Sequence, residues 1–251
     1  MVIAVSGKGG TGKSTLATLI VRYLIDRGER PVLAVDADPN SNFGDKLGLQ
    51  PDRTIGGLRE DALKQKHEAS GTPKQRGIEY EIQQAVNEGS GFDLLSMGRG
   101  EGPGCYCSVN NMVRTFLHDL TSGYKHVVID NEAGMEHLSR RTNDKVDLMI
   151  VVADRTPTGL KAAQRIAQLV RELDVVNGQM GLIINRVPER LCSEPPGVET
   201  GLVETGIPLL GCVPEDPLIE DFELHSEPLL GLPAACHALA AVRSILDNIE
   251  H

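Results

Sequence analysis

Seven short runs of Val, Ile, Leu and Ala alternate with more polar segments along this chain. Each run is almost continuously apolar, which is typical of parallel strands that are covered on both faces. The predicted strands are residues 2–6, 31–35, 92–97, 127–130, 148–153, 181–184 and 209–213. Stretches in which apolar residues recur at helical spacing predict helices at residues 14–27, 109–120, 159–173 and 235–249. This alternation predicts an α/β fold of three layers, in which a mostly parallel central sheet is flanked by helices.

A polar segment, residues 54–91, separates the second and third predicted strands. Its Gly-Gly and Ser-Gly-Thr-Pro breaks favour an inserted helical or lid segment within one domain of residues 1–251. The last predicted helix is amphipathic, but Arg243 is its only basic residue, whereas a membrane-surface helix has a polar face rich in Lys and Arg. We therefore expect this helix to pack on the sheet.

Charge and composition narrow the classes of partner. The chain carries a formal net charge of −10, which opposes a nucleic-acid surface, and its lack of Trp and 3% of aromatic residues oppose a base-stacking platform. The first residues, MVIAVSGKGG, do not have the pattern of a signal peptide, and the apolar runs are too short to span a bilayer. We expect a cytoplasmic protein with neither nucleic acid nor membrane as a partner, whose five cysteines do not form a disulfide framework.

The segment GKGGTGKST, at residues 7–15, follows the first strand and opens the first helix. It fits the phosphate-binding pattern G-x-x-x-x-G-K-[ST] in the strand–loop–helix context that this motif requires. Glycines let the loop from Gly9 through Gly10 and Thr11 to Gly12 point several N–H groups at a phosphate. Lys13 is expected to bridge the outer phosphates, Ser14 to bind Mg²⁺ and Thr15 to reach the inner phosphate of ATP or ADP.

Acidic residues close two further strands. Asp36 and Asp38 lie in VDADPN after the second strand, and Asp130 ends HVVID. Ligands of parallel α/β sheets bind at the carboxyl ends of the strands, so these carboxylates are expected beside the phosphate loop.

A second lysine, Lys8, gives the pattern KGGTGKS, which resembles the deviant P-loop ATPases, the group of MinD, ParA and the nitrogenase iron protein. The resemblance implies a homodimer in which Lys8 reaches the partner's phosphates and assists catalysis with Lys13. It also implies that Asp38 orients the attacking water and that Asp36 and Asp130 touch Mg²⁺ through water.

The same resemblance implies an adenine site. It comprises the strand-end residues Asn185 and Arg186, and the loop residues Pro214, Glu215 and Asp216 that follow the next strand.

Two cysteines, Cys105 and Cys107, lie in the glycine-rich segment GRGEGPGCYCSVNN, directly before a predicted helix with Ser108 as its N-cap. A helix N-terminus favours the thiolate, the form that binds metals. Two thiolates do not complete a metal site, but a twofold axis through the predicted metal-binding loop, residues 98–107, would supply four.

This cysteine loop, together with DNEAGMEHLSRRT, resembles the CooC-type nickel ATPases that mature carbon monoxide dehydrogenase. The resemblance implies nickel at Cys105 and Cys107 and delivery to carbon monoxide dehydrogenase or to the related acetyl-CoA synthase. Thiolates suit zinc and iron–sulfur clusters at least as well as nickel, so Zn²⁺ at the same cysteines stays open.

Two other functions compete with nickel delivery. An iron–sulfur or zinc-binding ATPase of the nitrogenase iron protein type would also place cysteines at the dimer axis, but the expected second switch after Asp130 holds no cysteine. A partition or cell-division ATPase is opposed by the acidic charge and leaves the cysteine pair unexplained.

Overall fold

The computed structural model of the chain describes residues 1–38, 42–58, 84–98, 120–131, 146–192 and 205–249. Its strands are β1 (Val2–Gly7), β2 (Val32–Asp36), β3 (Val86–Glu88), β4 (Asp93–Ser96), β5 (His126–Asp130), β6 (Val146–Ala153), β7 (Val176–Val187) and β8 (Leu209–Pro214). Its helices are α1 (Lys13–Asp26), α2 (Asn42–Leu47), α7 (Pro157–Leu173), α9 (Pro217–Leu224) and α10 (His237–Ile249), with 3₁₀ turns η1 (Glu189–Leu191) and η2 (Leu229–Gly231).

The eight strands form one sheet in the order β3-β4-β2-β5-β1-β6-β7-β8. All neighbouring strands are parallel except β3 and β4, which are antiparallel at one edge. β1 lies between β5 and β6, while the chain that leaves β1 through α1 returns two places away as β2. The strand order therefore reverses beside β1, and such a point in a parallel sheet is where ligands bind.

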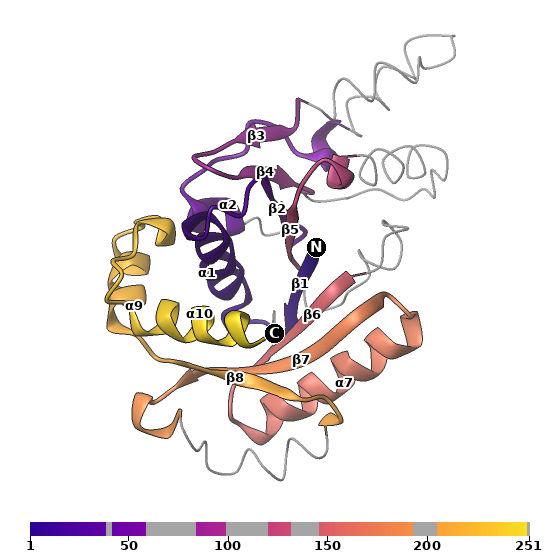
Figure 1. The fold of residues 1–251 in the computed structure, drawn as a ribbon, viewed down its shortest axis with the longest axis vertical. Coiled ribbons are helices and arrows are strands. Elements are labelled where there is room, and N and C mark those ends of the chain that lie inside the picture. The colour runs from indigo at the N-terminus through magenta and orange to yellow at the C-terminus, as the bar shows by residue number, and fades with distance from the viewer. Residues whose placement is uncertain (39–41, 59–83, 99–119, 132–145, 193–204, 250–251) are drawn as a thin grey trace.

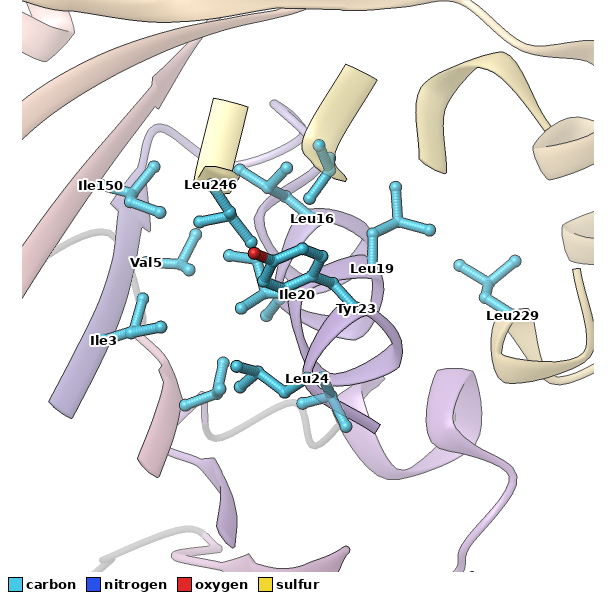
Figure 2. Close-up of a cluster of buried hydrophobic side chains, with 14 of the residues drawn as sticks. Ile3, Val5, Leu16, Leu19, Ile20, Tyr23, Leu24, Ile150, Leu229 and Leu246 are labelled. Atoms are coloured by element: carbon cyan, nitrogen blue, oxygen red, sulfur yellow. The ribbon is translucent and has the colours of Figure 1, made fainter. Parts of the chain in front are cut away.

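Helices cover both faces of the sheet, as the continuous apolar runs require (Figure 1). On one face α7 packs against alternate residues of the strands, and on the other face α1, α2 and α10 do so. In Figure 2, Ile3 and Val5 of β1 face Leu16 and Ile20 of α1, with Leu246 of α10 beside them. This packing fixes α1, and with it the loop between β1 and α1, relative to the sheet.

The α/β prediction is confirmed, and all seven predicted strands are present with their ends moved by a few residues. The largest change is in β7, which spans 12 residues because Val176–Met180 continue the strand as a partly exposed extension. The end of segment 54–91, predicted to be helical or a lid, instead contributes the edge strand β3 and so adds to the sheet. Residues 59–83 of that segment, and all of the predicted helix 109–120 except its last residue, lie outside the described residues.

Within the described ranges, two helices are not predicted by the sequence, α2 after the second strand and α9 after the last. None of the helices in the described ranges combines the length and the apolar character that crossing a membrane requires.

Candidate functional site

The loop between β1 and α1 folds as a phosphate-binding loop. Gly10 and Gly12 have φ values of 81° and 88°, in the left-handed region that glycine adopts without strain. The Lys8 carbonyl accepts hydrogen bonds from the Thr11 hydroxyl at 2.8 Å and the Thr11 backbone N–H at 3.3 Å, which close the loop on itself. Because α1 begins directly at Lys13, the unpaired N–H groups of its first turn face the hollow of the loop.

Asn185 and Arg186 brace this loop from β7. The Asn185 side-chain N–H donates to the Thr11 carbonyl at 2.9 Å, and the Arg186 guanidinium donates to the Gly10 carbonyl at 3.0 Å. A Cβ atom at Gly12 would collide with the Asn185 amide, so this glycine is needed for the close approach as well as for its φ. The sequence predicts an adenine contact for both β7 residues; the structure shows that they position the phosphate loop, and the adenine contact stays a prediction.

Asp36 and Asp130 lie side by side at the carboxyl ends of β2 and β5, where they are register partners. Both carboxyl groups are fully buried. Burial, together with the neighbouring Asp130 charge, raises the pKa of Asp36 to about 7. Burial raises the pKa of Asp130 to about 6, although the nearby Ser14 hydroxyl and Lys13 ammonium favour its ionised form.

The surroundings of Asp130 fit a magnesium ion. Within the described ranges, neither of its buried carboxyl oxygens has a hydrogen-bond partner of normal geometry, which is a costly arrangement unless a cation or water completes it. Mg²⁺ prefers oxygen ligands and retains several waters. Ser14, Asp36 and Asp130 are thus brought together as the residues that could hold it.

The segment after β2 is anchored to these carboxylates. The Asp38 backbone N–H donates to the Asp36 carboxylate at 3.2 Å, and the Phe43 N–H donates to its other oxygen at 3.3 Å. The Ala37 N–H donates to the Asp130 carbonyl at 3.0 Å. Asp38, the predicted water-orienting residue, is therefore held beside the predicted magnesium ligands.

A cavity of about 670 Å³ continues from the phosphate loop toward α9. It brings together six of the predicted nucleotide contacts, namely Thr15, Asn185, Arg186, Pro214, Glu215 and Asp216. Its wall also contains Pro217, at the end of the predicted base-covering loop, and residues that sequence reasoning missed, namely Pro188, Glu189, Ile219, Glu220 and Glu223. The size and position of the cavity suit the base and ribose of a nucleotide whose phosphates lie on the loop.

Asp216 has a structural task in this wall. One of its carboxylate oxygens accepts from the Leu218 N–H at 3.0 Å and caps α9, and the other accepts from the Ala238 N–H at 3.0 Å at the start of α10. Partial burial would raise the pKa of Asp216, but the bonds from Ala238, the Cys236 thiol and Leu218 hold it below its usual value. The predicted base contact is thus a carboxylate that joins two helices.

Glu223 and Lys46 form a second polar group at the cavity, and neither was singled out from the sequence. Glu223 on α9 accepts from the Thr15 hydroxyl at 3.1 Å and from the Lys46 ammonium at 2.5 Å. No local sequence pattern predicts these contacts, because Thr15 and Glu223 are 208 positions apart in the chain.

Cys105 and Cys107 lie outside the described residues, as does the rest of the predicted metal-binding loop after Gly98. Within the described residues, no group of three or more His, Cys, Asp or Glu side chains could hold a metal ion. The predicted nickel or zinc site therefore stays a prediction.

Comparison with known proteins agrees with this geometry. Residues 2–229 match the family described as the CobQ/CobB/MinD/ParA nucleotide binding domain. An uncharacterized ATP-binding protein of Methanocaldococcus jannaschii is 39% identical over 99% of this chain and 98% of its own length. The carbon monoxide dehydrogenase accessory protein CooC of Rhodospirillum rubrum is 33% identical over 99% of this chain and 97% of its own length.

The fold has close counterparts among solved structures. The septum site-determining protein MinD of Pyrococcus horikoshii, complexed with Mg-ADP, superposes with a TM-score of 0.70 over 99% of this chain and 95% of that one, at 22% identity. The phosphate loop, the strand-end carboxylates and the family match together lead to one conclusion: this chain is a P-loop ATPase of the CobQ/CobB/MinD/ParA family.

Proposed function

We propose that this ATPase is a nickel chaperone, which dimerises with nucleotide, binds nickel through Cys105 and Cys107 at the dimer axis, and inserts it into carbon monoxide dehydrogenase or acetyl-CoA synthase. The observation that carries the proposal is the Cys-Tyr-Cys motif in its glycine-rich loop. The identity of 33% with a carbon monoxide dehydrogenase accessory protein, over almost the full length of both chains, supports it.

ATP hydrolysis would proceed at the carboxyl edge of β1, β2 and β5. The loop N–H groups and Lys13 would hold the phosphates, and Ser14, Asp36 and Asp130 would hold Mg²⁺, which neutralises charge on the transferring phosphoryl group. Asp38 would orient the attacking water. Lys8, whose side chain is exposed on the loop, would add its charge to the phosphates of the partner subunit.

The described residues offer a route from this site toward the cysteine loop. Ser96 of β4 is the register partner of Asp36, and the next residue, Met97, donates its N–H to the Asp36 carbonyl at 2.8 Å. The predicted metal-binding loop starts at the following residue, Gly98. If nucleotide binding shifts the end of β2 at Asp36, Ser96 and Met97 would shift with it. These two residues directly precede the first residue of the predicted metal-binding loop.

A nickel titration tests the proposal. Reduced protein is titrated with Ni²⁺ without nucleotide, with ADP and with a non-hydrolysable ATP analogue, while molecular mass and thiolate-to-nickel absorption are followed. We expect one nickel per dimer, with binding lost in the double variant Cys105→Ala/Cys107→Ala and nucleotide affinity retained.

Cys192→Ala and Cys212→Ala are matched controls. Burial raises the pKa of both thiols, that of Cys212 to about 11, so they stay protonated near neutral pH and make poor metal ligands. If nickel fails to bind in every nucleotide state, nickel delivery is wrong. Tighter binding of Zn²⁺, or an iron–sulfur spectrum after reconstitution, would favour the alternative of a zinc or iron–sulfur ATPase of the nitrogenase iron protein type.

A further inference from the structure

A single carboxylate oxygen joins three helices at the nucleotide cavity. Oε1 of Glu223, on α9, accepts from the Thr15 hydroxyl of α1 at 3.1 Å and from the Lys46 ammonium of α2 at 2.5 Å. The family match covers all three residues without assigning a role to Lys46 or Glu223. We call this set the Thr15–Glu223–Lys46 contact.

The contact lies where a nucleotide has to enter. Thr15 and Glu223 both line the cavity, and Thr15 is two residues beyond Lys13 in the first turn of α1. The Lys46 ammonium acts on Asp130 as well as on Glu223, and the Arg186 guanidinium also acts on Glu223. Lys46 is thus a cation between the base cavity and the predicted magnesium ligands.

The surroundings of the Glu223 carboxylate are those of a bound anion. It has a hydroxyl donor, two nearby cations and the N-terminal turn of a helix, which are the partners that a phosphate group also uses. A hydroxyl has only one proton to donate, so Thr15 cannot serve a phosphate and Glu223 at once. Two anions at this spot would also repel each other.

We propose that Glu223 occupies the place of an inner nucleotide phosphate in the nucleotide-free protein, and that Lys46 is a further nucleotide-binding residue, which passes from Glu223 to that phosphate when ATP or ADP binds. Helix α9 allows this exchange at small cost. None of its residues is fully buried, and the Glu223 side chain retains 36% of its exposure. Partly exposed ion pairs contribute little to stability, so the fold does not depend on this one.

Calorimetric titration of the full-length protein with Mg-ADP tests the exchange. ADP is chosen because it carries the inner phosphates and is not hydrolysed. Glu223→Gln should bind ADP about three- to tenfold more tightly because the competing charge is gone, and Lys46→Gln should bind it about tenfold more weakly because a charged partner of the phosphate is lost. Lys46→Arg keeps the charge and should stay near the wild-type affinity.

The double variant Lys46→Gln/Glu223→Gln separates this proposal from a plain structural ion pair. If Lys46 contacts the phosphate, the double variant binds ADP about tenfold more weakly than Glu223→Gln alone. If the pair merely joins α2 to α9, both single variants weaken ADP binding alike or leave it unchanged, the double variant is no worse than either one, and the proposal is overturned.

Two controls complete the design. Lys125→Gln breaks a comparable ion pair, that of Lys125 with Glu29. This pair lies beside the start of β5, whereas Asp130 is at the other end of the strand. The variant should therefore leave ADP affinity unchanged. Lys13→Ala should abolish ADP binding. If Lys13→Ala still binds ADP, the phosphate loop has been misassigned, and that failure is distinct from a failure of the Lys46 proposal.

Discussion

At the residue scale, the nucleotide site divides into what local sequence predicts and what it does not. The phosphate loop is predictable because its glycines, Lys13 and Ser14 lie within one short stretch of sequence. That one loop supplies most of the predicted phosphate contacts. Asp36 and Asp130 were also foreseeable, since each ends an apolar run at the same edge of the sheet. Lys46 and Glu223 were not, because they meet Thr15 only through tertiary packing of three helices.

The position of Asp38 leads to a prediction about hydrolysis. Its backbone N–H is bonded to the buried Asp36, so the residue stays beside the magnesium ligands whatever its own side chain does. Asp38→Ala should therefore retain ATP binding and lower kcat about a hundredfold or more, the range for loss of a group that moves or orients a proton in the reaction. Release of inorganic phosphate measures kcat, and filter binding measures ATP affinity.

Asp52→Ala, at an exposed position outside the site, is the control for loss of a carboxylate. Hydrolysis at the wild-type rate by Asp38→Ala would show that another group orients the water.

At the element scale, prediction was accurate where burial dictates the sequence. β1, β2, β5 and β6 lie inside the sheet with helices on both faces, so their apolar runs are unmistakable. β3 was missed because an edge strand of three residues, Val-Asn-Glu, has neither an apolar run nor a period to detect. α9 was missed although Asp216 and Pro217 are a typical N-cap and first helical residue, because the segment was interpreted only as a base-covering loop.

The double capping by Asp216 leads to a prediction about stability. Asp216→Ala removes the cap of α9 and the acceptor at the start of α10 together, at a cost of about 1 kcal/mol for each cap and thus about 2 kcal/mol in the free energy of unfolding. Asp216→Asn keeps one acceptor oxygen and should fall between the two. Urea denaturation followed by circular dichroism measures the difference.

The same residue sets a pH dependence. Because the folded-state pKa of Asp216 lies below its ordinary value of 3.8, its contribution is fully present above pH 3.8 and is lost as the pH falls through the folded-state pKa. The stability difference between wild type and Asp216→Ala should therefore shrink below about pH 4. A difference that is constant from pH 7 to pH 3 would mean that the charge of Asp216 is irrelevant to capping.

At the scale of the whole molecule, the sheet order concentrates the chemistry at one edge. β1 stands between β5 and β6, so the phosphate loop emerges with Asp130 on one side and the end of β6 on the other. Sequence alone predicted the alternation of strands and helices but not this order, because the order depends on which apolar faces pack together over the full length of the chain. The strand order also determines which side chains of one subunit can reach its own nucleotide site.

Lys8 is an exposed cation at this edge of the sheet. Its carbonyl closes the loop by accepting from Thr11, while its side chain is exposed at the surface. A cation in that position is suited to a second copy of the site, where it would stabilise charge on the transferring phosphoryl group. We therefore expect Lys8→Ala to bind ADP nearly as the wild type does, but to lose ATP-dependent dimerisation and at least about tenfold in kcat.

Sedimentation with a non-hydrolysable ATP analogue, alongside phosphate release, separates these effects. Lys8→Arg keeps the charge and should restore part of both activities. A Lys8→Ala protein that dimerises and hydrolyses ATP as the wild type does would mean that the subunit completes its site alone. The exposed lysine would then be a solvated side chain beside the phosphates, and the dimer that the proposed twofold metal site needs would form without it.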